Sequence, residues 1–220
     1  MSIRFNKRLI DQEPFEACSV FDVNNDGFVD IVSGAYWYEG PEFRRKNRIC
    51  EVKAVGEYRE DFSDYPMDVD GDGWMDIITA SFWSTHVQWR KNPGQTGVDW
   101  ETYDIGPNTC IETVRFYDID GCGVPEIFAN AITEPQKFFK LLVDANGKGT
   151  GKFAEYVIGE EAAGHGMGFA DINGDGRMDI VLSGGWLEQP ENPLTTPWIF
   201  HKEFDLGSAS IPVLGHDVAG

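Results

Sequence analysis

The 220-residue sequence predicts an all-β protein made of repeated antiparallel sheets. Three observations lead to this prediction: an acidic nine-residue string that recurs along the chain, the even spacing of its copies, and the short apolar segments around each copy. Aromatic residues make up 13% of the sequence and there are 25 glycines, which suits twisted sheets with many turns. The elements of one repeat should therefore recur in the others.

The acidic string has the form Asp-x-(Asp/Asn)-x-Asp-Gly-x-x-Asp. It is intact at residues 22–30 (loop 1), 68–76 (loop 2) and 171–179 (loop 4). A damaged copy at 118–126 (loop 3) has Cys122 in place of its third acid, and a fifth copy begins at Asp217. The five starts lie 46, 50, 53 and 46 residues apart, a period typical of one supersecondary unit used repeatedly.

Each intact string supplies oxygen ligands at positions 1, 3, 5 and 9 and a backbone carbonyl at position 7, with glycine at position 6 for the turn. An all-oxygen, flexible set favours Ca²⁺ over Zn²⁺ or Mg²⁺, at about one ion per intact loop. The thiol of Cys122 is a poor ligand for a hard cation, so loop 3 should hold none tightly. The expected ligands are Asp22, Asn24, Asp26, Phe28, Asp30, Asp68, Asp70, Asp72, Trp74, Asp76, Asp171, Asn173, Asp175, Arg177 and Asp179.

An EF-hand would place a bidentate glutamate at position 12 of the loop and a helix on each side. Position 12 is Ser33, Thr79 or Leu182 in the three intact copies. The residues after each loop begin with β-branched or apolar pairs and stop within a few residues, which indicates short strands. The sequence therefore excludes the EF-hand.

Two further features complete the repeat. A segment Trp-x-(Glu/Lys)-x-Pro follows three loops, at 37–41, 89–93 and 186–190, and its tryptophan is expected to pack between sheets. Before each loop, an extended stretch closes with an apolar residue, as at Val55, Ile105, Ile158 and Leu206. Four strands per repeat follow, and a period in the high forties with four short strands is typical of a β-propeller blade.

These motifs resemble the VCBS and FG-GAP repeats of calcium-loop propellers, whose blades are similar to those of the integrin α head. The resemblance covers essentially the whole chain and is strongest at residues 171–181. It implies a propeller of about seven blades, of which about four are present here. The expected division is 1–12 as the closing outer strand of the last blade, 13–58 as blade 1, 59–106 as blade 2, 107–159 as blade 3, 160–207 as blade 4, and 208–220 as the start of blade 5.

The segment from Ile3 to Ile10 is expected to pair with C-terminal blades of the same chain that this sequence does not contain. An open ring of this kind should expose sheet faces and associate with itself.

Composition excludes several partners. The net charge of −19 argues against nucleic acid and anionic membranes, and three bound divalent cations would reduce it to −13. No apolar run reaches membrane-spanning length, and residues 1–8 lack the apolar stretch of a secretory signal, so a cytoplasmic location is expected, with secretion not excluded. The four cysteines have no metal-site spacing and are expected to be buried or free thiols.

Ligand binding is expected on the rim opposite the calcium loops, where the chain enters the innermost strands. Acids, histidines and aromatic rings in these connections suit a sugar, because rings stack on pyranose faces and carboxylates bind hydroxyls. Six residues before each loop start stand Glu16, Phe62, Glu112, His165 and Ile211. Near them are Tyr36, Asp64, Trp83, His86 and Arg115. The candidates for catalysis are His165, Glu112, Glu16 and His216.

The sequence leaves two classes of function open. The first is a calcium-stabilised binding module that presents its axial rim to a carbohydrate or a protein. The second is an enzyme, since the chain is also similar to the propeller part of aldos-2-ulose dehydratase. That likeness implies a sugar lyase in which a rim metal assists proton abstraction. The binding module is favoured, because a rim metal needs at least two ligand side chains at the mouth and only His165 and His216 occupy comparable positions.

Overall fold

The computed structural model describes residues 4–207 and 213–216. Ile3, Ile211 and the loop that begins at Asp217 lie outside the described residues, so the expectations for them are not addressed by the structure.

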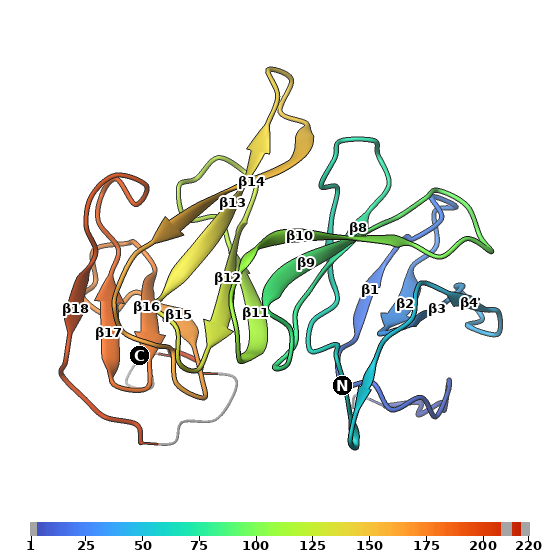
Figure 1. The fold of residues 1–220 in the computed structure, drawn as a ribbon, viewed down its shortest axis with the longest axis horizontal. Coiled ribbons are helices and arrows are strands. Elements are labelled where there is room, and N and C mark those ends of the chain that lie inside the picture. Colours follow the sequence, from blue (N-terminus) through green and yellow to red (C-terminus); the bar gives the residue numbers. More distant parts are fainter. Residues whose placement is uncertain (1–3, 208–212, 217–220) are drawn as a thin grey trace.

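Four four-stranded antiparallel sheets lie side by side along the molecule (Figure 1), each with its strands in sequence order. The first contains β1 (Ser19–Phe21), β2 (Asp30–Ser33), β3 (Tyr36–Tyr38) and β4 (Lys46–Arg48). The second contains β7 (Tyr65–Met67), β8 (Asp76–Thr79), β9 (His86–Lys91) and β10 (Glu101–Pro107). The third contains β11 (Ile111–Tyr117), β12 (Glu126–Ala131), β13 (Lys137–Val143) and β14 (Gly149–Val157). The fourth contains β15 (Gly168–Ala170), β16 (Asp179–Leu182), β17 (Gly185–Glu188) and β18 (Ile199–His201).

These sheets are the blades of an all-β propeller fold, as predicted. The four acidic loops occupy equivalent places, because each joins the first strand of a blade to the second. The register is also equivalent: position 9 of each loop is the first residue of the second strand and pairs with the last residue of the first, as in Phe21 with Asp30 and Met67 with Asp76. The repeated sequence therefore builds a repeated geometry.

The expected closing stretches are correct in two blades and wrong in two. Strand β10 contains Ile105, and β14 ends one residue before Ile158. In blade 1, however, the outer strand is β4, and Val55 belongs to a separate hairpin of β5 (Ala54–Val55) and β6 (Tyr58–Arg59). Gly56 adopts a φ of 62° in the turn of this hairpin, a conformation that glycine favours. In blade 4, β18 ends five residues before Leu206.

Residues 4–10 form no strand in the structure, and all but the last are exposed. A strand exists only through hydrogen bonds to a partner strand, and residues 4–10 pair with no strand of the described part of the chain. The pairing of this segment stays a prediction.

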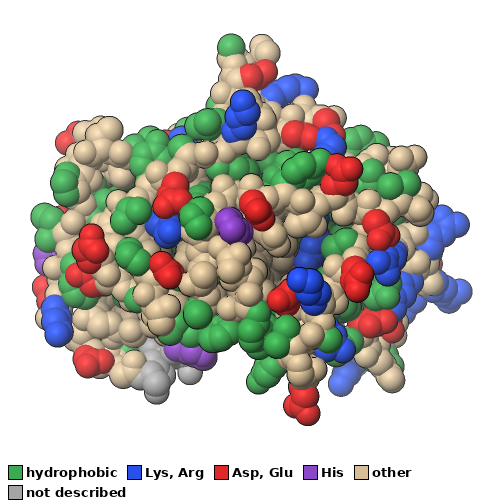
Figure 2. Space-filling view, in the orientation of Figure 1, with side chains coloured by type: hydrophobic (Ala, Val, Ile, Leu, Met, Phe, Trp, Pro, Cys, Tyr) green, Lys and Arg blue, Asp and Glu red, His purple; other side chains and the backbone are tan. Residues whose placement is uncertain are grey.

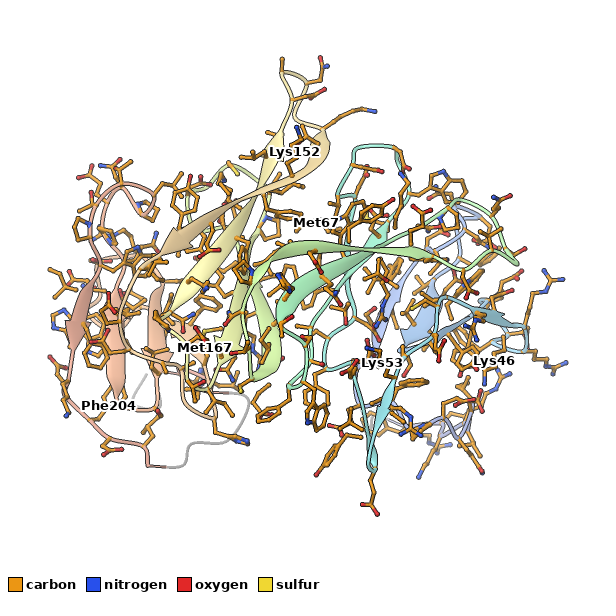
Figure 3. The ribbon with its side chains drawn as sticks, in the orientation of Figure 1. Lys46, Lys53, Met67, Lys152, Met167 and Phe204 are labelled. Atoms are coloured by element: carbon orange, nitrogen blue, oxygen red, sulfur yellow. The ribbon has the colours of Figure 1, made fainter. Side chains whose placement is uncertain are left out.

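Three hydrophobic cores lie between consecutive blades. The core between blades 1 and 2 includes Trp37, Ile77 and Trp100, and the core between blades 2 and 3 includes Trp89 and Phe139. The core between blades 3 and 4 is formed by residues such as Phe128, Met167 and Leu187. Met67 and Met167 mark two of these cores in Figure 3. Since burying one large apolar side chain contributes about 1.5–3 kcal/mol, blade-to-blade packing is the main source of stability.

Trp186 is buried and stacks on His201 of its own blade with ring centroids 4.2 Å apart, as Trp89 stacks on Tyr103. All four cysteines have free thiols, and Cys50 is buried, as expected.

One close backbone approach ties blade 3 to loop 2. The backbone N–H of Gly151 donates to the carbonyl of Val69 over 2.8 Å, and Lys148 donates to the carbonyl of Gly71. At Gly149, an added Cβ would lie 2.3 Å from the Val69 oxygen, so only glycine fits there. The β13–β14 hairpin, which extends from the body of the molecule in Figure 1, therefore contacts loop 2 through residues next to its turn.

Within the described residues, no helix is long and apolar enough to cross a membrane. On the face shown in Figure 2, acidic side chains are spread over the blades, whereas several basic side chains gather at the right-hand edge, where Figure 3 labels Lys46.

Candidate cation loops and ligand-binding hollow

The acid at position 9 of every loop is completely buried, and its hydrogen bonds hold the loop against its blade. One carboxylate oxygen accepts the backbone N–H of position 2, as in Val69 to Asp76 over 2.9 Å. In loops 1, 2 and 4 the other oxygen accepts an N–H from just beyond the third strand, as in Asn92 to Asp76 over 2.8 Å. Burial raises the pKa of Asp76 to about 7 against the opposing effect of these hydrogen bonds, so a nearby cation would favour its ionised form.

The acids at positions 1 and 5 of each intact loop accept backbone N–H groups of that loop. In loop 1, Asp22 accepts the backbone N–H groups of Asp26 and Gly27, and Asp26 accepts that of Phe28 over 2.9 Å. Loops 2 and 4 repeat the position 5 contact to Trp74 and Arg177. These contacts close each loop into a compact turn that carries several oxygen groups, the ligand type that a calcium ion binds in sets of six to eight.

Loop 2 fits a cation best. Oxygens of Asp68, Asp70 and Asp76 lie within 4.8 Å of one another. The Oδ1 atom of Asp68 is buried and has no hydrogen-bond partner, which is costly for a carboxylate unless a cation compensates it. Lys91 pairs with Asp70 and with Asp72, at 3.0 Å from the latter, and contacts neither Asp68 nor Asp76. The residues present in loop 2 therefore fit a bound metal ion.

Loop 3 already contains a positive charge. The Nζ atom of Lys140 lies 2.6 Å from Glu126, 2.8 Å from Asp120 and 3.2 Å from the Sγ atom of Cys122. Burial disfavours the charged amine, but the hydrogen bonds to Asp120 and Glu126 outweigh it and raise the pKa of Lys140 above its ordinary value.

Asn92 and Gln189 tie neighbouring blades together, a role that the sequence analysis missed. Both occupy the residue before the proline of the Trp-x-(Glu/Lys)-x-Pro segment. The side-chain amide of Asn92 donates to the carbonyl of Val23 in loop 1 over 2.9 Å, and that of Gln189 donates to Ile119 in loop 3 over 2.8 Å. The sequence contained one signal for this role: an amide side chain stands directly before the proline in two copies of the motif.

The segments that lead into the innermost strands of blades 1, 2 and 3 line one hollow of about 380 Å³. Its wall contains Cys18, Asp64, Tyr65 and Arg115, among others. Tyr65 is partly exposed and stacks on Phe116 of the next blade, with ring centroids 3.6 Å apart. The structure thus brings the predicted rim residues Asp64 and Arg115 together, and we name this feature the axial hollow.

Asp64 belongs to a buried cluster under the axial hollow. The Arg90 guanidinium lies 2.9 Å from Asp61 and 3.5 Å from Asp64, and all three side chains are buried. Burial and the charge of Asp61 raise the pKa of Asp64 to about 8, even though Arg90 opposes the rise. One oxygen of Asp64 accepts the backbone N–H of Gly34, and the other has no hydrogen-bond partner. The Asp64 side chain is fully buried and lies beneath the wall of the axial hollow.

Other predicted rim residues form two separate groups. Trp83 contacts Phe62 and Tyr58 with ring centroids 5.7 and 5.4 Å apart, so a partly exposed aromatic cluster lies beside the β5–β6 hairpin. His165 lies 3.1 Å from Glu112, a pairing of two residues that were predicted to face one mouth.

The remaining rim candidates lie elsewhere. The Tyr36 ring lies under Lys46, and His86 contacts Thr85. The exposed Glu16 has no side-chain partner within the described chain, and His216 lines an open hollow beside loop 4.

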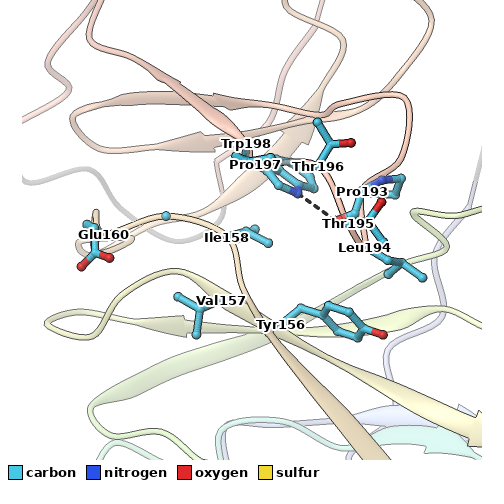
Figure 4. A pocket seen from close by; sticks show the side chains of 11 residues that line it. Tyr156, Val157, Ile158, Glu160, Pro193, Leu194, Thr195, Thr196, Pro197 and Trp198 are labelled. Atoms are coloured by element: carbon cyan, nitrogen blue, oxygen red, sulfur yellow. Dashed lines mark hydrogen bonds between the residues drawn. The ribbon is translucent and has the colours of Figure 1, made fainter.

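A further hollow of about 370 Å³ lies between the outer strand of blade 3 and the loop before β18, and it is drawn in Figure 4. Tyr156 and Trp198 contribute aromatic rings to it, and the Trp198 indole N–H donates a hydrogen bond to the carbonyl of Pro193. Thr195 and Thr196 provide exposed hydroxyl groups, and we name this feature the outer cleft.

Comparison with known proteins agrees with this geometry. A family model described as FG-GAP-like repeat matches residues 68–129 and 141–182, which include loops 2, 3 and 4. The chain contains FG-GAP-like repeats. The resemblance noted in the sequence is thereby confirmed, and the FG-GAP-like repeats correspond to the blades described above.

A solved structure with the same fold is that of a lectin from Agrocybe aegerita, reported for its specific recognition of non-reducing terminal N-acetylglucosamine. The TM-score is 0.51 at 20% sequence identity, over 86% of this chain and 53% of the lectin. The chain thus spans about half the length of the lectin, and the likeness shows a shared fold. No curated protein matches the sequence.

Proposed function

We propose that this FG-GAP-repeat propeller is a calcium-stabilised module that binds carbohydrate through the axial hollow. The observation that carries the proposal is the composition of that hollow: the guanidinium of Arg115 and the exposed ring of Tyr65 line one cavity, beside the buried Asp64. A sugar requires hydrogen-bonding groups that fix its hydroxyls and an aromatic face for its ring. The shared fold with a lectin supports a carbohydrate as the ligand class.

The charge of the protein favours a neutral sugar. A net charge of −19 repels anionic ligands at long range. Arg115 forms no ion pair within the described residues, so its donors remain available to hydroxyl or carbonyl oxygens.

Calcium is proposed to hold the loops and not to contact the sugar. Loops 1, 2 and 4 contain carboxylates whose mutual repulsion a divalent ion would relieve. Because they join the first and second strands of each blade, an ion there fixes the inner strand on which the axial hollow depends. Calcium should therefore act on sugar affinity only through the stability of the fold.

Binding is tested by calorimetry with a panel of neutral mono- and oligosaccharides that includes N-acetylglucosamine with a free non-reducing end. Arg115→Ala and Tyr65→Ala should each weaken binding by about 5- to 30-fold, because each removes a direct ligand contact worth about 1–2 kcal/mol. Thr196→Ala in the outer cleft is the matched control and should leave affinity unchanged. Loss of binding in the control alone would place the sugar in the outer cleft, and no binding by any sugar would reject the proposal.

The pairing of His165 with Glu112 supports a second candidate, a sugar-eliminating enzyme. A carboxylate 3.1 Å from the imidazole can orient it as a general base. The two groups of three potential metal-binding side chains within the described residues lie in loops 2 and 3, and loop 3 follows the end of β11 opposite to the one that carries Glu112. Turnover of a carbonyl sugar that is lost in His165→Gln would establish the enzyme, and its absence would leave the binding module.

A further inference from the structure

Position 9 of each loop is the first residue of the second strand of its blade. The residue opposite it on the third strand differs among the blades. The observed pairs are Ile31 with Tyr38, Ile77 with Arg90, Ile127 with Phe139 and Ile180 with Leu187. Continuing each register by one residue places Glu39, Lys91, Lys140 and Glu188 opposite the position 9 acids of loops 1 to 4 in turn. This is the variable Glu/Lys position of the Trp-x-(Glu/Lys)-x-Pro segment, extended to blade 3 by Lys140.

Lys140 contacts three positions of its loop, whereas Arg177 pairs with one loop acid, Asp175 at position 5 of loop 4. The Lys140 ammonium contacts positions 3, 5 and 9 together, through Asp120, Cys122 and the fully buried Glu126. Glu126 also differs from the other position 9 acids, because the atom that elsewhere accepts a backbone N–H from beyond the third strand here accepts from Lys140 over 2.6 Å. Three of the groups that would coordinate a metal therefore already surround a cation.

Lys91 provides the contrast within the same chain. It stands at the equivalent register position but pairs only with positions 3 and 5, whereas both oxygens of Asp76 accept backbone N–H groups. The orphaned Oδ1 atom of Asp68 leaves room for a cation at the centre of loop 2. In loops 1 and 4, Glu39 and Glu188 place a further acid at this position, and Glu188 lies 3.4 Å from the amide of Asn173 in loop 4.

We propose that Lys140 is the built-in cation of loop 3, so that blade 3 is held by an ammonium group where its neighbours bind a divalent ion. The proposal rests on the proposed calcium role of loops 1, 2 and 4. It explains why the damaged loop keeps Asp118, Asp120 and Glu126: three carboxylates and a thiol still require a positive charge to fold together. A single ammonium with three donors supplies it without the hard-ligand demands of calcium.

The first experiment counts bound calcium by equilibrium dialysis of the whole 220-residue chain. The wild type should bind one ion in each of loops 1, 2 and 4. Asp68→Ala should remove one of these ions, because it deletes the position 1 carboxylate that every loop has, whereas Asp118→Ala, the same change in loop 3, should remove none. A wild-type ion that is lost in Asp118→Ala would overturn the proposal, and a wild type that binds no calcium at all would reject the calcium role of the other loops.

The second experiment separates Lys140 from Cys122. The double variant Cys122→Asp/Lys140→Met should gain an ion in loop 3, because it restores the fifth-position acid and removes the competing ammonium. The control Cys122→Asp/Lys152→Met has the same composition of charges and removes an exposed lysine of β14 instead (Figure 3). It should gain no ion. A gain in both variants would mean that Cys122 alone decides occupancy and would overturn the proposal.

A third measurement does not depend on calcium. In excess chelator, Lys140→Gln should melt about 4–8 °C below the wild type, because it leaves the buried Glu126 without its counter-charge. Lys152→Gln should melt within about 2 °C of the wild type. Equal melting temperatures for the two variants would show that Lys140 does not hold loop 3.

Discussion

The side-chain amide of Asn92 lies 2.9 Å from the backbone carbonyl of Val23, and this contact joins blade 2 to loop 1. The same amide donates to Met75 over 3.1 Å, and the backbone N–H of Asn92 donates to Asp76. One residue therefore connects two neighbouring cation loops, and Gln189 repeats the contact between blades 4 and 3.

Replacing Asn92 should weaken the contact between blades. Asn92→Ala leaves the buried carbonyl of Val23 without a partner, and we expect the free energy of unfolding to fall by about 1–3 kcal/mol. Urea denaturation measures the change. Gln12→Ala, an exposed amide without such a contact, should stay within about 0.5 kcal/mol of the wild type, and equal values for the two variants would contradict the role of Asn92.

Removing calcium should lower the melting temperature. An ion that binds only the folded protein stabilises it by about 2.7 kcal/mol per site when its free concentration is a hundred times the dissociation constant. Asp72→Ala, which removes position 5 of the most acidic loop, should reduce the shift caused by chelator. Thermal scans with and without chelator check this, with Glu57→Ala as an exposed acidic control. An unchanged wild-type midpoint would contradict the structural role of calcium.

Asp64 should make the protein less stable in alkali. Its folded-state pKa is about 8, above the value of about 3.9 for an unfolded aspartate, so the folded state holds the proton more tightly. The resulting stability is fully present below about pH 4, declines above it and is lost as the pH rises through about 8.

Asp64→Asn removes this titration and keeps an oxygen that can accept the Gly34 N–H. Its loss of stability between about pH 6 and pH 9 should be smaller than that of the wild type, as measured by urea denaturation. Equal losses in the two proteins would show that Asp64 does not carry the effect. The exposed Glu57→Gln should behave as the wild type does.

Gly149 should tolerate no side chain. The added Cβ of Gly149→Ala would lie 2.3 Å from the Val69 carbonyl oxygen, so the β13–β14 hairpin must move from loop 2. We expect a loss of about 1–3 kcal/mol in unfolding free energy and a weaker calcium affinity of loop 2. At Gly184 an added Cβ meets no atom within 4 Å, and Gly184→Ala serves as the control that should change neither quantity.

The sequence by itself determined the blades and the loops, because these depend on residues close together in the chain. An acidic string with glycine at position 6 specifies a turn, and the β-branched pairs that follow specify the second strand, as at Ile77 and Ile78. Because the string and its strands recur at a regular spacing, a pattern that is weak in one copy predicts the fold when the copies are taken together. The outer strand of blade 1 was misplaced because Val55 has the same local pattern as Ile105 but pairs with Tyr58 in its own hairpin.

Only the tertiary structure decided which distant side chains meet. Lys140 is 20 residues from Asp120, and its entry into loop 3 follows from the register of β12 with β13. Asp64 acquired its shifted pKa from burial beside Asp61 and Arg90, and the pairing of His165 with Glu112 depends on how blade 4 packs on blade 3. Such contacts depend on strand register and blade packing, and neither can be predicted from the residues next to a single lysine or histidine in the sequence.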